Sequence, residues 1–236
     1  MEAETFFYPV TLLPLIAFIL RNNPDFTLPL TPSVRKYLQT VTDGTRFNKS
    51  RGKTYLPLVA LPKNKNSVNA IMKRLYELCD CYNECGGENA FKYLIGEIVD
   101  NIYEHSEFNT ALVMAQRYPT KGFTDVCFFD DGITINGCFK KHGLEGRNDC
   151  EAIIEATEGV STKSKERGFG LNTTMRICTN GTSGDMLIIS GNGGLLTTEK
   201  YRQPYRLEKE LELTGTLVGF RIPFMGNEVN IYEFLE

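Results

Sequence analysis

Apolar and polar residues repeat along the chain with two different periods, and this pattern predicts the main helices and strands. The clearest helical stripe is formed by Phe91, Leu94, Ile95, Ile98 and Ile102, which are spaced like one face of a helix over residues 88–106. Further helices are expected over residues 11–22, 33–41, 67–82, 150–157 and 168–179. Strands are expected over residues 54–61, 111–118, 125–129, 185–190, 194–201 and 215–224.

The order of these elements predicts an α+β protein. Beyond residue 65 helices come first and mainly hairpin-connected strands follow, which favours helices packed on one face of a mixed, largely antiparallel sheet. A polar, proline-containing stretch at residues 61–67 is typical of a linker. We therefore expect a small N-terminal α/β unit over residues 1–64 and a second domain over residues 65–236.

Composition is that of an ordinary globular protein. Hydrophobic residues make up 42% of the 236 positions and charged residues 23%, with a net charge of −3. Because no block of the chain is rich in Lys or Arg, we expect no nucleic-acid partner.

Cysteine usage and the apolar N-terminal stretch bear on location. Seven cysteines without a repeating spacing do not form a disulfide framework, so reduced thiols in the cytoplasm are expected. Residues 9–20 are apolar but contain Pro14 and are too short to span a bilayer. No basic segment precedes them, since Arg21 is the first cation. We expect a buried helix there and no membrane association.

Residues 97–106, EIVDNIYEHS, carry the first chemical signal. Glu97, Asn101 and His105 are four residues apart, so they form one column beside the apolar stripe of their helix. A carboxylate in this position can act as a general base, and an amide oxygen can bind Mg²⁺ next to phosphate oxygens. The plainer interpretation is a polar shoulder on a surface helix.

The second signal is a carboxylate at the end of an apolar strand. Residues 125–129 lead directly into Asp130, Asp131 and Gly132. A partly buried aspartate must find hydrogen-bond donors, and the exocyclic amine of a nucleotide base is such a donor. An ordinary Asp-Gly turn between two strands would give the same pattern.

The third signal is a Gly-x-Gly helix start behind a polar stretch. Hydroxyl and cationic side chains gather just before it, at Ser161, Thr162, Lys163, Lys165 and Arg167. The glycines Gly168 and Gly170 then open an apolar helical pattern, where backbone N–H groups can approach an anion. The alternative is a solvated loop followed by a helix. The spacing fits neither a P-loop nor a Rossmann motif, and with two histidines in the chain a three-histidine metal site is excluded.

The order of these features resembles the GHKL superfamily, also called the Bergerat-fold or histidine-kinase-like ATPases. An E-x-x-x-N helix, a D-x-G turn, a Gly-x-Gly helix start and a late Thr-Gly-Thr at 214–216 follow one another over residues 68–224. The E-x-x-x-N-x-x-x-H form of residues 97–105 is most similar to the anti-sigma-factor serine kinases within that group. The resemblance implies a Bergerat-type α/β sandwich that binds ATP and Mg²⁺.

The resemblance also implies roles for individual residues. Asn101 would bind the magnesium ion, and Glu97 would be the base that activates water or a protein hydroxyl. Asp130 would accept a hydrogen bond from the adenine amine, Gly132 would leave room for the ring, and Thr216 would close the adenine pocket through water. Residues 136–167 would form the lid over ATP, and the phosphate-side contacts would come from Lys163, Arg167, Gly168 and Gly170. Leu171 would also belong to the nucleotide-binding residues.

One departure from the family pattern concerns the D-x-G-x-G box. Thr134 stands where the second glycine is usual, which puts lid closure in doubt more than base recognition. No phospho-acceptor histidine in a dimerisation helix precedes residue 97, and no transducer domain follows residue 224. We therefore expect neither a complete sensor kinase nor a topoisomerase-like or chaperone-like machine.

Three functions stay open at this point. The first is an ATP-dependent regulatory switch or Ser/Thr protein kinase that acts on a protein partner. The second is an ATP hydrolase that uses lid closure and association of two copies as a timer. The third is a non-catalytic nucleotide-binding or interaction protein. The sequence does not name the partner.

Overall fold

The computed structural model describes most of the chain. The described residues are 8–22, 32, 36, 39, 40, 43, 47, 48, 53–79, 84–160, 170–224 and 226–235. Most of the helix expected at 33–41 lies outside them.

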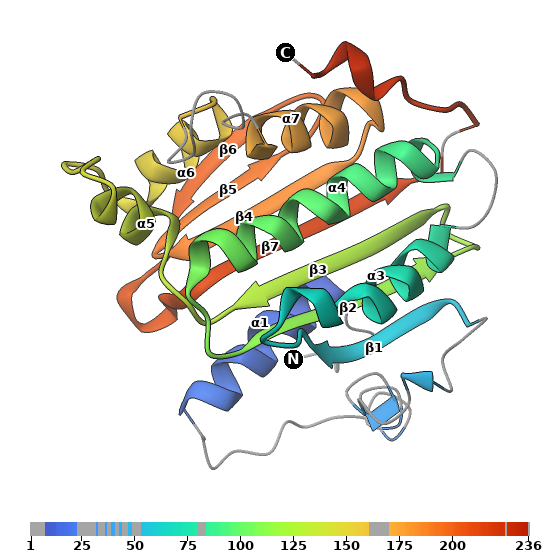
Figure 1. The fold of residues 1–236 in the computed structure, drawn as a ribbon, viewed down its shortest axis with the longest axis horizontal. Helices are drawn as coiled ribbons and strands as arrows, with labels where there is room; N and C mark the ends of the chain where they lie inside the picture. Colours follow the sequence, from blue (N-terminus) through green and yellow to red (C-terminus); the bar gives the residue numbers. More distant parts are fainter. Residues whose placement is uncertain are drawn as a thin grey trace.

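A seven-stranded antiparallel sheet runs through the molecule (Figure 1). Its strands are β1 (Tyr55–Ala60), β2 (Ala111–Tyr118), β3 (Phe123–Asp130), β4 (Asp185–Gly191), β5 (Gly193–Thr197), β6 (Arg202–Arg206) and β7 (Leu213–Pro223). Their order across the sheet is β1-β2-β3-β7-β4-β5-β6. Strand β7, the last in the sequence, is therefore inserted between β3 and β4 at the centre of the sheet, where it brings their ends together.

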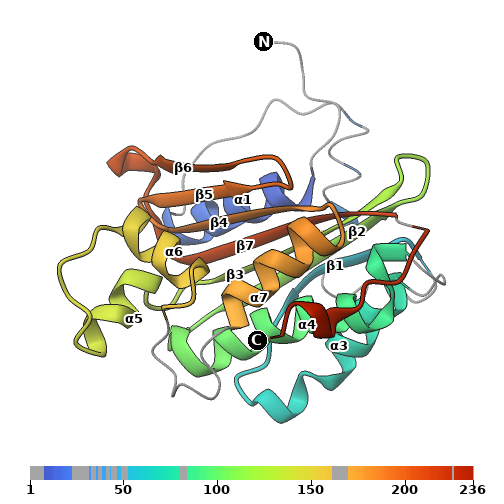
Figure 2. The same cartoon turned by 90° about the horizontal axis from the view of Figure 1, so that it is seen from above.

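Helices cover both faces of this sheet, but unequally (Figure 2). The α-helices in the described part of the chain are α1 (Pro9–Asn22), α3 (Asn69–Tyr76), α4 (Glu88–Asn101), α5 (Ile135–Lys141), α6 (Asp149–Thr157) and α7 (Gly170–Arg176). Of these helices, α3 to α7 lie on one face and α1 lies on the other. The α+β class is confirmed, and the helices beyond residue 65 share one face of the sheet as expected, while α1 of the N-terminal segment covers the other face.

Successive side chains of the central strands point to opposite faces of the sheet, which explains why helices pack on both faces. In β3, Val126 and Phe128 face α4, whereas Cys127 and Phe129 face α1. Helix α1 is apolar along its length, so it can bury Leu12 and Leu13 against this second set. Both faces of the central strands are thus apolar because both faces are covered.

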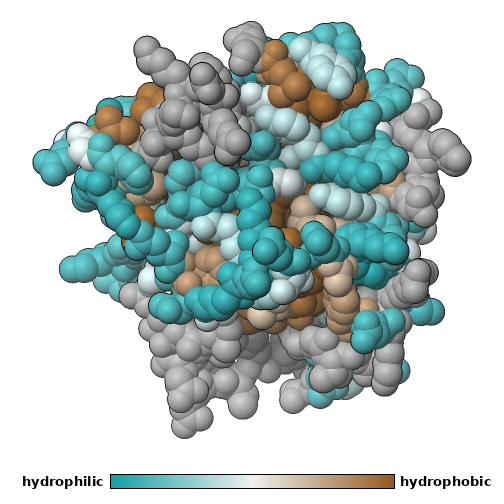
Figure 3. Space-filling view, viewed as in Figure 1, coloured by the Kyte–Doolittle hydropathy of each residue, from teal (hydrophilic) through white to brown (hydrophobic). Residues whose placement is uncertain are grey.

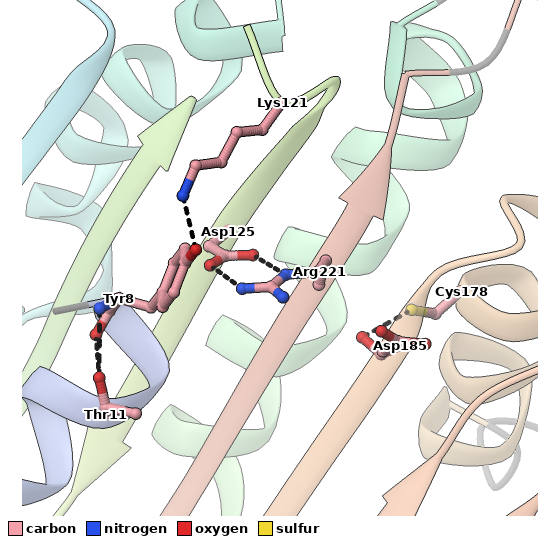
Figure 4. A network of polar contacts seen from close by, with 7 residues as sticks. All are labelled: Tyr8, Thr11, Lys121, Asp125, Cys178, Asp185 and Arg221. Atoms are coloured by element: carbon pink, nitrogen blue, oxygen red, sulfur yellow. Dashed lines mark hydrogen bonds and ion pairs between the residues drawn. The ribbon is translucent and has the colours of Figure 1, made fainter. Parts of the chain in front are cut away.

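A polar cluster fastens the start of α1 to the sheet (Figure 4). Lys121 Nζ donates to the hydroxyl of Tyr8 at 2.6 Å, and the Arg221 guanidinium lies 4.7 Å from the centre of the Tyr8 ring. Arg221 also forms a bidentate pair with Asp125, with both N–O distances at 2.9 Å. Burial raises the pKa of Asp125, and the hydrogen bonds from Arg221 offset only part of that rise. The start of the N-terminal helix is therefore held by a hydrogen bond and a cation–ring contact at Tyr8 as well as by its apolar face.

Strand β1 and helix α1 both belong to the same layered structure as the elements beyond residue 65. The division into units 1–64 and 65–236 stays a prediction. None of the described helices combines the length and the hydrophobicity that crossing a membrane requires. The cytoplasmic location also stays a prediction.

Candidate functional site

A cavity of about 130 Å³ lies between α4, the ends of β3 and β7, and helices α5 to α7. It would hold about four water molecules, and an apolar cavity of about this size can accept a flat aromatic ring. Its wall includes Asn101, His105, Asp130, Thr134, Cys138, Gly170, Leu171 and Thr216. Residues from all three sequence signals therefore meet at one place.

Asp130 is the buried carboxyl of this cavity. It is the last residue of β3 and is 4% exposed, on the same face of the strand as Phe128. Burial raises the pKa of Asp130 to about 7, although hydrogen bonds with the Gly132 N–H and with the Ser106 side chain lower it. Ionising a buried carboxyl costs free energy because water no longer solvates the charge. A hydrogen-bond donor on a bound ligand can compensate for this loss.

The residues after Asp130 have separate structural tasks. Asp131 points away from the cavity and accepts hydrogen bonds from the N–H groups of Asn109 and Thr110, both at 2.7 Å. Gly132 packs against the backbone of Ser106 so closely that any β-carbon would overlap the Ser106 carbonyl oxygen. Glycine is required there for contact between this turn and the end of the α4 helix, whereas the resemblance gave it a role beside the bound ring.

Thr216 lies beside Asp130 because β3 and β7 are paired in register at these two residues. On its other side Thr216 is paired with Ser190 of β4, and the two hydroxyl oxygens are 2.9 Å apart. Ser190 Oγ also accepts a hydrogen bond from the Ile135 N–H at the start of α5, at 2.9 Å. Asp130, Thr216 and Ser190 thus form a row of polar side chains across β3, β7 and β4. Ser190 in this row fixes both the hydroxyl of Thr216 and the first turn of α5.

The Glu97–Asn101–His105 column is carried by α4 and the turn after it. The helix is regular to Asn101 and then widens into a π-helical turn over Ile102–Ser106. Asn101 and His105 both line the cavity despite this change. Two of the three side chains in the expected column therefore line the cavity, although the sequence analysis assumed a single regular helix.

Glu97 lies one turn before Asn101, against the start of α7. A β-carbon at Gly170 would overlap Oε2 of Glu97, so this glycine is what lets the carboxylate approach the helix start. The charge of Glu97 also raises the pKa of Tyr93, after the larger effect of burial. Glu97 thus occupies a partly enclosed position between α4 and α7, next to the cavity wall.

Thr134, which replaces the usual glycine of the family box, has a clear structural task. Its hydroxyl accepts a hydrogen bond from the Gly137 N–H at 2.9 Å and caps the N-terminus of α5. The next helix, α6, starts with a capping box formed by Asn148 and Glu151. Much of the expected lid, residues 136–167, is therefore helical and packed against the sheet.

Three of the expected phosphate-side residues, Lys163, Arg167 and Gly168, lie outside the described residues. Gly170 and Leu171 are described, and both line the cavity. In the parts of the chain that are described, no three side chains of His, Cys, Asp or Glu are grouped to hold a metal ion. Asn101 provides an amide oxygen at the cavity wall, which suits Mg²⁺ only if the nucleotide supplies further oxygen ligands.

Two site residues, Ser106 and Ser190, were missed by sequence reasoning. Ser106 is buried at the end of the π-helical turn and is in hydrogen-bonding distance of Asp130. Ser190 ends the apolar run of β4 in the same way that Asp130 ends β3. A polar residue at the end of an apolar strand is the signal that predicts both Asp130 and Ser190. The sequence analysis recognised this signal only in β3.

A second hollow, a groove of about 970 Å³ between α3 and α4, lies on the helical face of the molecule. This face shows apolar side chains surrounded by polar ones (Figure 3). Both lysines and carboxylates line the groove, and Lys65 forms an ion pair with Asp100 at 2.8 Å. The groove has no buried carboxyl comparable to Asp130 among its described residues, so the smaller cavity is the better candidate.

Comparison of the chain with models of protein families, with curated proteins and with solved structures gave no match. Support for a function therefore comes from the geometry of the site and from the order of its motifs.

Proposed function

We propose that the protein binds ATP with Mg²⁺ in the cavity beside Asp130 and acts as a GHKL-type regulatory switch or Ser/Thr protein kinase on a protein partner. The carrying observation is the buried carboxyl of Asp130, which faces a ring-sized cavity next to the hydroxyl of Thr216. A base with an exocyclic amine would give this carboxylate the donor that burial otherwise denies it. The order of motifs along the chain supports the same proposal.

The residues of this chain would share the work in a simple way. Asp130 and Thr216 would orient the base, while the apolar walls at Ile133, Phe139 and Leu171 would exclude water from it. Bound Mg²⁺ would neutralise phosphate charge, with Asn101 as the protein's ligand. Glu97, held beside Gly170, would accept the proton of the attacking hydroxyl. The ADP product would use the same base contacts.

Calorimetric titration of ATP with Mg²⁺ tests the proposal. We expect binding by the wild-type protein and a loss of about 10- to 150-fold in affinity for Asp130→Asn, because a hydrogen bond to a charged group contributes about 1.5–3 kcal/mol. The matched control is Asp185→Asn on β4, whose carboxyl also has a raised pKa but lies at the other end of the sheet. Equal binding by wild type and Asp130→Asn, or no binding by folded wild type, would contradict the proposal.

The alternative of an ATP hydrolase is supported by the same position of Glu97, since water can replace a protein hydroxyl. Steady release of free phosphate that Glu97→Gln abolishes would identify a hydrolase. Phosphate transfer to a partner with little free phosphate would identify the kinase. Asp100→Asn on the exposed side of α4 is the matched control and is expected to leave either product unchanged.

A further inference from the structure

Cys138 is the cysteine that lies beside both histidines of the chain. It lies on α5, is 7% exposed and forms part of the cavity wall. Its sulfur is 3.9 Å from Nδ1 of His105 and 3.9 Å from Nδ1 of His142. Both histidines of the chain therefore contact this one thiol.

The two imidazoles have different roles. His142 Nδ1 is 2.9 Å from the carbonyl oxygen of Cys138, which can only accept, so this nitrogen carries a hydrogen and donates it. The same N–H dipole lies near the sulfur and favours negative charge on it. His105 Nδ1 approaches from the π-helical turn at Ile102–Ser106 and is placed to take the thiol proton. A thiol between an acceptor and a donor is the arrangement that activates cysteine as a nucleophile.

Three of the other described cysteines, Cys127, Cys150 and Cys178, lack this arrangement. Cys127 and Cys178 are completely buried, and burial raises the pKa of both thiols well above the usual range. Cys150 is partly exposed, but its thiol donates to the carbonyl oxygen of Tyr205 at 3.1 Å. These residues provide internal controls for any reaction at Cys138.

We propose that Cys138 is a modification site: a nucleophilic thiol that reacts with small electrophiles, peroxides in particular, inside the same cavity that binds nucleotide. In the reaction with hydrogen peroxide, the sulfur attacks one oxygen and the O–O bond breaks. The sulfur is oxidised to sulfenic acid, the peroxide is reduced to water, and the thiol proton passes through His105 to the leaving hydroxide.

Modification and nucleotide binding would exclude each other, a consequence that rests on the proposed function. The cavity of about 130 Å³ has no spare room for an added group beside a bound ring. A bound base would conversely cover the sulfur. Peroxide would then switch off nucleotide binding until a thiol reductant restores Cys138.

The reactivity itself is tested without nucleotide. The full chain is treated with iodoacetamide, which transfers its acetamide group to sulfur with loss of iodide, and each cysteine is followed by peptide mass spectrometry. We expect Cys138 to react about tenfold or more faster than Cys150, and His105→Gln to remove most of that advantage across pH 6–9. Sulfenic acid is then sought at Cys138 after peroxide treatment. A rate at Cys138 no higher than at Cys150, or no effect of His105→Gln, would overturn the proposal.

Mutual exclusion is tested by repeating the alkylation at saturating ATP with Mg²⁺, with the binding measured independently by calorimetry. We expect ATP to slow the reaction at Cys138 about tenfold or more and to leave Cys150 unchanged. Calorimetric binding without protection would overturn mutual exclusion alone. A reactive Cys138 in a protein that binds no ATP would instead sink the proposed function and leave the modification site standing.

Discussion

Asp130 is deeply buried, yet in the proposed function its carboxyl ionises when it accepts a hydrogen bond from a bound base. The protonation state of this carboxyl therefore also affects the free energy of unfolding. Its pKa is about 7 in the folded protein, whereas an unfolded aspartate titrates near 4. Between these two values the folded chain holds a proton that the unfolded chain has lost. The free energy of unfolding therefore falls as pH rises through this window.

This shift predicts a measurable pH dependence. From pH 5 to pH 8 the wild-type protein should lose about 3 kcal/mol of unfolding free energy that Asp130→Asn does not lose, since the amide does not titrate. Urea unfolding of both proteins at the two pH values measures the difference. Because Asp125 and Asp185 titrate in both proteins, their contributions cancel. Identical pH dependence in the two proteins would show that Asp130 does not carry the raised pKa.

At the scale of single residues, local motifs predicted which residues come together better than they predicted the contacts of each residue. Asn101, Asp130, Gly170 and Thr216 were chosen from local motifs, and all of them line one cavity. Ser190 could not be found this way, because its task depends on its register with Thr216, which lies 26 residues further along the chain. Register between distant strands is not encoded by any short motif.

Short elements show a similar limit. Strand β2 has the bounds expected from its sequence, since a buried apolar run bordered by polar turns is a strong signal. Helix α5 was missed because it has seven residues and a single turn of apolar spacing. Strand β6 was missed because the sequence RQPYR is mostly exposed and lacks alternation. Neighbouring elements rather than local propensity stabilise both.

Helix α5 provides a test at this scale through its capping residue. Thr134→Ala removes the hydroxyl that accepts from the Gly137 N–H, and we expect a loss of about 1 kcal/mol of unfolding free energy. Thr134→Ser keeps the hydroxyl and should stay near wild type. Urea unfolding of the three proteins distinguishes the cap from the volume of the side chain. A substitution to alanine without effect would mean that the cap contributes nothing to stability.

For the molecule as a whole, the central position of β7 makes the site depend on the complete sheet. Asp130 and Thr216 face the same cavity only when β3 and β7 are correctly paired. Ligand that binds this arrangement, and not the unfolded chain, must stabilise the entire fold.

This linkage predicts the size of the effect. At an ATP concentration 100 times the Kd, with Mg²⁺ present, the free energy of unfolding should rise by about 2.7 kcal/mol, which corresponds to a Tm increase of about 5–10 °C. Differential scanning calorimetry measures the shift. At the same concentration Asp130→Asn should show a much smaller shift, while Asp185→Asn should match wild type. A full shift in Asp130→Asn would place the ligand elsewhere.

The two outer strands of the sheet have a consequence for how copies of the protein meet. Strand β1 contains Pro57 and a register irregularity between Leu56 and Val59, and strand β6 contains Pro204. Proline lacks the N–H that a further strand would need, so both borders resist pairing with a strand from another molecule. Growth of fibres by pairing of outer strands between molecules is thereby disfavoured, even at high protein concentration. Contact between two copies is expected to use a face of the molecule.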